Sequence, residues 1–163
     1  MRAFAFGMAV FLFSVSPSMA QDWGTYFNMA TFGAGGGSDT NGWLNFECAG
    51  PDSGFSSSGE PFFSIVIGDR FRDEKQDLEP LITIRVDGGK TYAVPMAFDV
   101  KSTRVLKNDR RPEIFPEMQA LIAGLRTGMQ ATAWSGTRQL AEVDLTGSFA
   151  ALEYIAACIA GEE

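Results

Sequence analysis

Six to eight short apolar segments, separated by turn-forming residues, limit what this chain can fold into more than any other feature of its sequence. Segments of about four to eight residues that are rich in β-branched and aromatic side chains are typical of strands. No helical pattern alternates with them, so we expect a mainly β fold, either an antiparallel sandwich or a half-barrel. The expected strands lie at residues 23–29, 43–48, 62–67, 81–86, 91–98, 100–106, 129–134 and 141–145.

The clearest hairpin consists of residues 81–86 and 91–98, which flank an Asp-Gly-Gly turn at 87–89. Because proline cannot donate a hydrogen bond to a neighbouring strand, Pro95 predicts an edge strand or a bulge. Residues 33–41 contain four glycines and predict a flexible loop between two strands.

Two helices are expected late in the chain, at about 113–127 and 148–160. Gly128 fits the end of the first helix, and Ser148 fits the N-cap of the second. In the first helix, the apolar residues that share one face are Ile114, Met118, Leu121, Ile122 and Leu125. In the second helix, the expected inner face consists of Phe149, Leu152, Ile155, Ala156 and Ile159.

Residues 1–20 have the order of features that is typical of a cleavable signal peptide. Arg2 precedes an apolar run at 3–15, which is shorter than the roughly 20 residues that a membrane-spanning helix needs. Small residues then fit a cleavage site that ends at Ala20. A buried N-terminal helix and an uncleaved anchor are the alternatives. Cleavage would leave a single β-rich domain at 21–163, periplasmic or secreted.

The chain is acidic, with 20 Asp and Glu against 13 Lys and Arg and a net charge of −7. An acidic surface repels nucleic acid and anionic lipid headgroups, so we expect no nucleic-acid partner. No second long apolar segment follows the first 20 residues, so we expect no stable membrane insertion after cleavage.

Cys48 and Cys158 are the only cysteines in the sequence. In an exported protein, an even number of cysteines predicts a disulfide, which would tie an early strand to the last helix. Alternation over residues 43–48 places Cys48 on one face with Leu44 and Phe46. The bridge would close a loop of about 110 residues and contribute at most about 4–5 kcal/mol. Two buried free thiols are the alternative.

The sequence contains no histidine. Ser-His-Asp and Cys-His catalysis both need an imidazole as base, and the common catalytic zinc sites need one as ligand. Acidic residues crowd positions 69–79, but their spacing does not match a calcium-binding loop, and neighbouring arginines would pair with them. We therefore expect no catalytic residue, no cofactor and no metal site, with carboxylate chemistry left open as the remaining enzymatic route.

Two groups of residues are candidates for binding. Trp23, Tyr26 and Trp43 lie on either side of the glycine-rich segment, and exposed aromatic residues near loops often mark recognition surfaces. The basic cluster Arg104, Lys107, Arg110 and Arg111 could bind an acidic group. The alternatives are aromatic side chains in the core and a solvated charged turn.

The C-terminal half has a recognisable pattern, in which LIAGLRTG at 121–128 precedes the expected strand 129–134 and the motif VDLTGSFAAL at 143–152. It resembles the tail of the bacterial invasion-associated locus B family, although Ser148 here separates the glycine from the phenylalanine. The ending at Cys158 is similar to that of small periplasmic proteins that accompany type VI secretion. The resemblance covers about residues 81–160 and implies a secreted, β-rich protein without established catalysis.

These features favour an exported, non-enzymatic module of the bacterial cell envelope that binds a protein or an envelope component. A periplasmic inhibitor or immunity-type protein against a cationic envelope hydrolase is the first alternative, since an acidic surface would suit such a partner. A carboxylate-dependent glycan hydrolase is the second alternative, because it needs only two acidic residues at a defined separation.

Overall fold

The computed structural model describes residues 21–28, 31–49, 61–73, 77–99, 101–108 and 114–160. The signal peptide predicted for residues 1–20 lies outside these ranges, as do Arg110 and Arg111 of the basic cluster. The predictions made for these residues therefore stay predictions.

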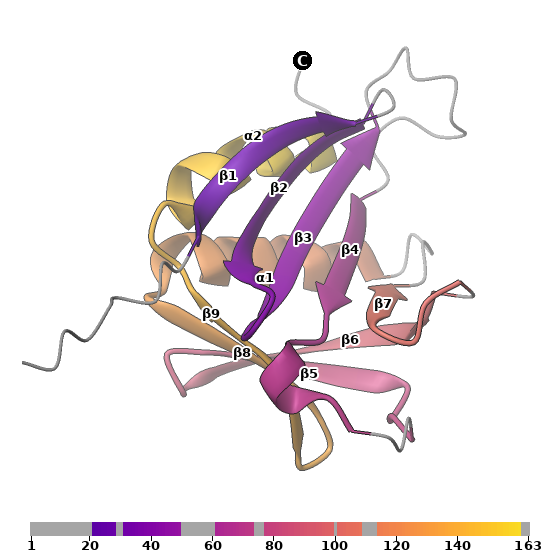
Figure 1. The fold of residues 1–163 in the computed structure, drawn as a ribbon. Helices are drawn as coiled ribbons and strands as arrows, with labels where there is room; N and C mark the ends of the chain where they lie inside the picture. The colour runs from indigo at the N-terminus through magenta and orange to yellow at the C-terminus, as the bar shows by residue number, and fades with distance from the viewer. Residues whose placement is uncertain are drawn as a thin grey trace, which may run out of the picture.

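The described residues form one nine-stranded antiparallel sheet and two α-helices, which confirms the predicted mainly β fold (Figure 1). The strand order is β1-β2-β3-β4-β7-β6-β5-β8-β9. The elements are β1 (Gln21–Asn28), β2 (Thr31–Ser38), β3 (Gly42–Ala49), β4 (Pro61–Val66), the 3₁₀ turn η1 (Asp69–Phe71), β5 (Leu81–Val86), β6 (Lys90–Phe98), β7 (Val105–Asn108), α1 (Phe115–Thr127), β8 (Gln130–Ser135), β9 (Arg138–Asp144) and α2 (Ser148–Ala160).

The sheet curls until its two end strands meet, as expected for a half-barrel. Trp23 on β1 donates its backbone N–H to the carbonyl of Thr146 at 3.2 Å and its indole N–H to the carbonyl of Asp144 at 2.9 Å. Further along β9, the N–H of Glu142 donates to the carbonyl of Asn41, between β2 and β3, at 2.8 Å. Strands β1–β4 therefore cross over β5, β8 and β9, with the apolar core between the two halves (Figure 1).

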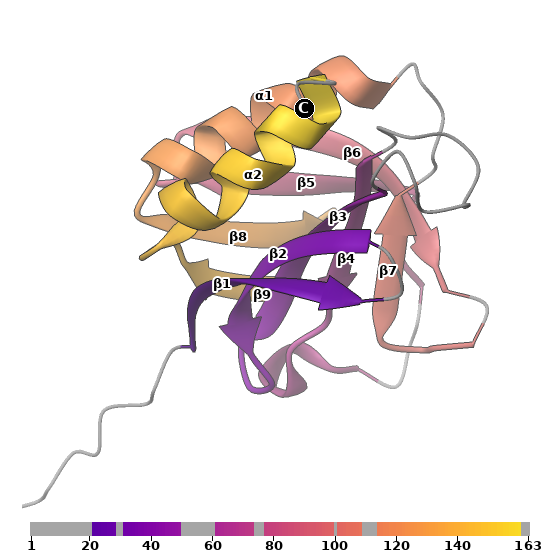
Figure 2. The same cartoon turned by 90° about the horizontal axis from the view of Figure 1, so that it is seen from above.

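The two helices pack against each other and cover one side of the sheet (Figure 2). Helix α1 lies against β5 and β6, and α2 lies against β1, β2 and β3. The predicted inner face of α1 is confirmed, because Met118, Leu121, Ile122 and Leu125 are all buried. None of the described helices is both long and apolar enough to span a bilayer.

One expectation for α2 is wrong, although its boundaries agree with the prediction. Phe149 is 57% exposed and lies under the guanidinium of Arg126, at 4.6 Å, instead of facing the core. The rest of the predicted face that is described is confirmed, because Leu152 and Ile155 are buried and Ala156 packs against the core. Ser148 and Ala151 are buried beside them. The buried Ser148 hydroxyl donates to the carbonyl of Leu125 on α1 at 2.7 Å, so it joins the two helices.

The glycine-rich segment predicted to be a flexible loop is β2, a central strand that pairs with both β1 and β3. Its glycines leave room for side chains from the neighbouring strands. A Cβ atom on Gly33 would collide with the ring of Tyr26, and one on Gly36 would collide with the ring of Trp23. Aromatic residues that cover glycines on an adjacent strand stabilise such sheets, so this strand is glycine-rich because of its packing.

Pro95 does not mark an edge strand, because β6 lies between β5 and β7. It sits where β6 changes partners: Leu81 on β5 pairs with Pro95, and pairing with β7 begins at the next residue, Met96. Proline is tolerated there because its missing N–H falls at the junction between two ladders.

Cys48 is fully buried on the inner face of β3, in line with Leu44 and Phe46, as the alternation predicted. Helix α2 packs against β3, so the fold brings the element that carries Cys158 to the strand that carries Cys48. The side chain of Cys158 lies outside those described, and the bridge stays a prediction.

Candidate functional site

The side of β1–β4 and β7 that is turned away from the two helices, called here the outer face, carries the candidate site (Figure 1). Alternation along β3 sends Leu44 and Phe46 into the core and places Trp43, Asn45 and Glu47 on the outer face. The register of the neighbouring strands extends this surface on both sides. Its outward side chains are those of Tyr26, Trp43, Asn45, Glu47, Phe62, Val66 and Lys107.

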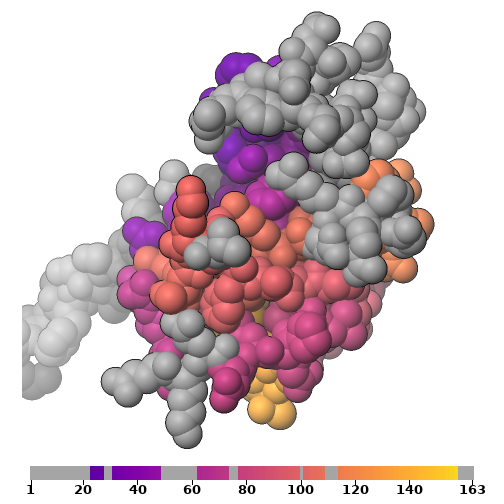
Figure 3. Space-filling model, turned by 90° about the vertical axis from the view of Figure 1, so that its right-hand side faces the viewer, coloured from indigo at the N-terminus to yellow at the C-terminus, as the bar shows by residue number. Residues whose placement is uncertain are grey.

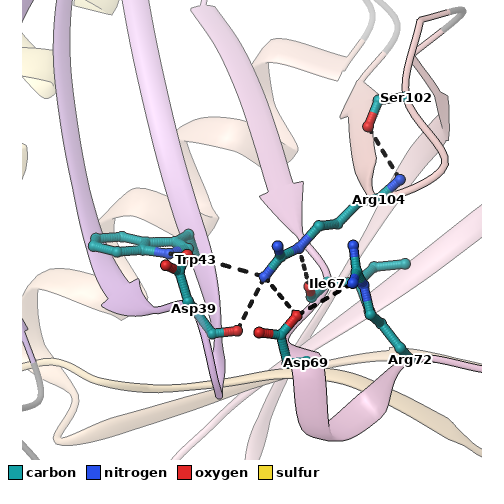
Figure 4. Close-up of polar contacts among 7 residues, drawn as sticks. All are labelled: Asp39, Trp43, Ile67, Asp69, Arg72, Ser102 and Arg104. Atoms are coloured by element: carbon teal, nitrogen blue, oxygen red, sulfur yellow. Dashed lines mark hydrogen bonds and ion pairs between the residues drawn. The ribbon is translucent and has the colours of Figure 1, made fainter.

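A cluster of charged side chains lies at the end of the outer face where β3 begins and β4 ends (Figure 4). At its centre, the guanidinium of Arg104 donates to the carbonyl of Ile67 at 2.9 Å and to the carbonyl of Asp39 at 3.0 Å. It also pairs with the carboxylate of Asp69 at 3.1 Å, and Arg72 approaches the same carboxylate oxygen at 3.5 Å. We call Asp39, Asp69, Arg72 and Arg104 the charged corner.

Trp43 joins the outer face to the charged corner, because its indole N–H donates to the carboxylate of Asp39 at 3.3 Å. The same carboxylate lies 3.9 Å from the guanidinium of Arg104. An aromatic ring and a guanidinium, both partly exposed, are therefore held beside each other by one aspartate. Three separate segments meet here: the β2–β3 turn, η1 and the residues that lead into β7 (Figure 4).

Arg70 extends the charged network to the far side of the β2–β3 turn. Its guanidinium donates to the amide oxygen of Asn41 at 3.1 Å and lies 3.9 Å from the carboxylate of Glu142 on β9. A polar cavity of about 190 Å³ lies between this turn and the neighbouring strands. It is lined by Gly37, Ser38, Asn41, Gln130, Glu142, Val143 and Asp144.

At the opposite end of the outer face, the hydroxyl of Tyr26 donates to the carboxylate of Glu47 at 3.2 Å. Burial beside its neighbours raises the pKa of the Tyr26 phenol well above its ordinary range, and the charge of Glu47 raises it further. Because the ring also lies over Gly33, Tyr26 is held in place while part of it stays exposed.

A second polar group lies on the β7 side. The ammonium of Lys107 pairs with the carboxylate of Asp99 and lies 5.1 Å from the centre of the Phe62 ring. The hydrogen bond from Lys107 lowers the pKa of Asp99. Beside this pair is a cavity of about 450 Å³, lined by Pro80, Pro95, Met96, Ala97, Phe98, Asp99, Lys107 and Asn108. The segments from β4 to β7 form much of the side shown in Figure 3.

Among the described residues, three carboxyl groups have a shifted pKa. The carboxyl groups with a shifted pKa are Asp87, Asp99 and Asp144, and each pKa is lowered by hydrogen bonds to the ionised form. Such groups stay ionised near neutral pH and accept hydrogen bonds. Within the described residues, no three potential metal ligands come together.

The predicted binding residues divide into three groups. Tyr26, Trp43 and Arg104 lie along or at the end of the outer face, and Trp43 and Arg104 share Asp39. Trp23 is buried and stacks against Phe46 in the core, so its ring is not on the surface. Arg110 and Arg111 lie outside the described residues.

Sequence reasoning missed Asp39 and Arg70 as members of the site. Asp39 follows β2 in a tight turn. Its place at the end of the sheet can be predicted only once residues 31–38 are recognised as a strand. Asp69 was expected to pair with the neighbouring arginines, and its contact with Arg72 agrees with that expectation, whereas its contact with Arg104 was not predicted.

Comparisons with protein-family models, with characterised proteins and with solved structures gave no match to this chain. The resemblance to the invasion-associated locus B family and to type VI secretion-associated proteins therefore stays a prediction.

Proposed function

We propose that this chain is an exported, non-enzymatic binding module of the bacterial cell envelope, which uses its outer face to bind a protein or an envelope component. The proposal depends above all on one observation: Trp43 and Arg104 are held side by side by Asp39 on a face that the two helices leave uncovered.

The chemistry of this surface supports recognition. Tryptophan, tyrosine and arginine are the residues that most often dominate binding energy at protein interfaces, and Trp43, Tyr26 and Arg104 supply one of each. The guanidinium of Arg104 is already fixed by two carbonyl groups and a carboxylate. A side chain held in one conformation loses little entropy when a partner binds, so this corner is preorganised.

A retention experiment with matched variants tests the proposal. The tagged mature domain would be incubated with an envelope extract of its host at low and at high salt, and a retained partner would then be purified and titrated. Trp43→Ala removes the indole from the outer face. Gln119→Ala alters an exposed side chain on α1, away from this face, and serves as the control. Unfolding midpoints would confirm that both variants are folded.

The expected result is a purified partner that binds wild type and Gln119→Ala equally and binds Trp43→Ala about tenfold or more weakly, as for a central interface residue. Equal binding by all three proteins would overturn the proposal. Retention of a basic hydrolase that is lost at high salt would favour the inhibitor alternative instead. Turnover of purified glycan would favour the hydrolase alternative.

A further inference from the structure

Strand β1 forms one edge of the sheet, and none of its residues belongs to the charged corner (Figures 1 and 2). Its four consecutive residues from Gly24 to Phe27 are all exposed. The sequence of β1, QDWGTYFN, contains neither lysine nor proline, the residues that often prevent an edge strand from pairing with another chain.

The register of β1 shows which of its backbone groups point away from β2. Asn28 pairs with Thr31 across a two-residue connection, so this pair is of the hydrogen-bonded type. Alternation then directs Tyr26 toward β2 and directs the N–H and C=O groups of Thr25 and Phe27 outward. The N–H of Trp23 also points outward, but it already donates to Thr146. The free part of the edge is therefore the stretch from Thr25 to Phe27.

Three exposed aromatic rings lie beside this free edge, and we call them the aromatic cluster. The ring centres of Phe27 and Phe32 are 4.9 Å apart, and those of Phe32 and Tyr154 are 4.8 Å apart. Phe27 is 65% exposed, Phe32 36% and Tyr154 47%. Exposed apolar side chains that adjoin one another mark interaction sites, whereas isolated ones do not.

We propose that the edge of β1 binds an extended segment of a partner protein, which adds a strand beside Thr25 and Phe27 and places an apolar side chain on the aromatic cluster. Outward backbone groups specify a strand, because only an extended chain presents N–H and C=O groups at the matching spacing. Charge complementarity favours a segment that carries lysine or arginine. The whole chain has a net charge of −7, and the Glu153 side chain beside Tyr154 stays 67% exposed although its carboxylate lies 3.9 Å from the guanidinium of Arg126.

A second copy of this chain fits the edge less well. Two molecules that each carry a net charge of −7 repel each other as they approach. A second copy would also bring the same acidic residues to the shared edge. A basic, extended segment can pair with the outward backbone groups, pack on the aromatic cluster and complement the negative charge of the chain.

The test uses two synthetic peptides and leaves the protein unchanged in its first arm. The first peptide is seven residues long and alternates valine with arginine and threonine, so that one face is apolar and the ends are basic. The second has the same sequence with alternate backbone nitrogens methylated, which removes the N–H groups of one edge. Binding is measured by titration, and hydrogen exchange reports on the amides of Thr25 and Phe27.

The second arm uses three variants of the full mature chain. Thr25→Pro removes one outward N–H and leaves the hydrogen bonds to β2 intact. Phe27→Ser removes one ring from the aromatic cluster. Phe149→Ser removes an aromatic side chain of similar exposure that lies under Arg126, outside the aromatic cluster, and is the matched control.

We expect the unmodified peptide to bind saturably and to slow exchange at Thr25 and Phe27. Methylation, Thr25→Pro and Phe27→Ser should each weaken binding about tenfold, while Phe149→Ser should leave it unchanged. No saturation up to about 1 mM, or equal binding of the methylated peptide, would overturn the proposal. A dimer in light scattering that Thr25→Pro abolishes would assign the edge to a second copy, and binding to anionic vesicles that Phe27→Ser abolishes would assign it to lipid. Either result would also overturn it.

Discussion

Two glycine-rich segments of this protein have opposite structures for different physical reasons. Strand β2 contains Gly33, Gly35, Gly36 and Gly37, and it pairs with β3 along its whole length and with β1 over most of it. The segment at 87–89 is the turn between β5 and β6. Gly33, Gly35 and Gly36 of β2 are covered by side chains from β1 and β3, whereas a Cβ atom on Gly88 or Gly89 would meet nothing within 4 Å.

The comparison separates two uses of glycine. In the β5–β6 turn, Asp87 and Gly88 have φ angles of 51° and 68°, and primed hairpin turns need such positive values. In β2, Gly33 and Gly36 provide space that the rings of Tyr26 and Trp23 fill, and Gly37 alone among the glycines of this strand has a positive φ. A glycine-rich segment therefore indicates a turn only where no neighbouring side chain lies over it.

The largest expected effect concerns β3, the strand beside β2, because it carries Cys48. Cys48→Ser would remove the predicted bridge to Cys158 and lower the free energy of unfolding by up to about 4–5 kcal/mol. The β5–β6 hairpin contains no cysteine, so it has no corresponding covalent link. Mass spectrometry of the unreduced mature protein should show a peptide linked through Cys48 and Cys158. Two thiols that alkylate without reduction would contradict the bridge.

The next effect compares single glycines in the two segments. A Cβ atom on Gly37, whose φ is 138°, would collide with the carbonyl oxygen of Gly42. Gly37→Ala therefore combines backbone strain with a backbone collision, and we expect it to cost about 3 kcal/mol or more. Gly89→Ala meets open space and should change stability by less than about 0.5 kcal/mol. Urea denaturation measures both, and equal costs would remove the distinction between the segments.

Gly88→Ala should fall between these two variants. It meets no neighbouring atom, but its φ of 68° is unfavourable for a residue with a side chain. The expected cost is about 1–2 kcal/mol, the usual penalty of a left-handed conformation. Gly88→Asn tolerates this conformation better and should recover part of the loss in the same denaturation experiment. If asparagine were as costly as alanine, backbone conformation would not explain the effect.

The smallest effect is a pH dependence confined to the hairpin turn. The carboxylate of Asp87 accepts the N–H groups of Met129 and Gln130 at 2.8 and 3.0 Å, which lowers its pKa. The folded-state pKa of Asp87 therefore lies below the unfolded-state value of about 3.9, so the ionised carboxylate stabilises the folded protein at pH values above about 3.9. This stabilisation is lost as the pH falls through the folded-state pKa.

Asp87→Asn keeps the favoured backbone conformation and removes the charge. The wild-type protein should unfold at a higher temperature than Asp87→Asn near pH 7, and this difference should shrink as the pH falls below about 4. Glu117→Gln on α1, where the carboxylate is exposed, is the control. A difference that stays constant with pH would show that the two hydrogen bonds do not depend on the charge.

Local patterns in the sequence determined most of the elements of this protein. The boundaries of α2 agree with the prediction, and the β5–β6 hairpin and the alternation of Leu44, Phe46 and Cys48 are confirmed. These features depend on residues close to one another in the chain, such as a turn sequence between two apolar runs. Their physical causes can therefore be recognised without knowledge of the fold.

Tertiary structure alone decided the identity of β2, the outward position of Phe149, the place of Pro95 and the meeting of Trp43 with Arg104. Each depends on atoms from another element: the Tyr26 ring of β1 over Gly33 of β2, or the Ile67 carbonyl that fixes Arg104. The candidate site is also of this kind, because Asp39, Asp69 and Arg104 come from three segments that meet only because β2, β3, β4 and β7 are neighbours in the sheet. A single sequence records which residues are present, and the packing of distant strands decides which of them become neighbours.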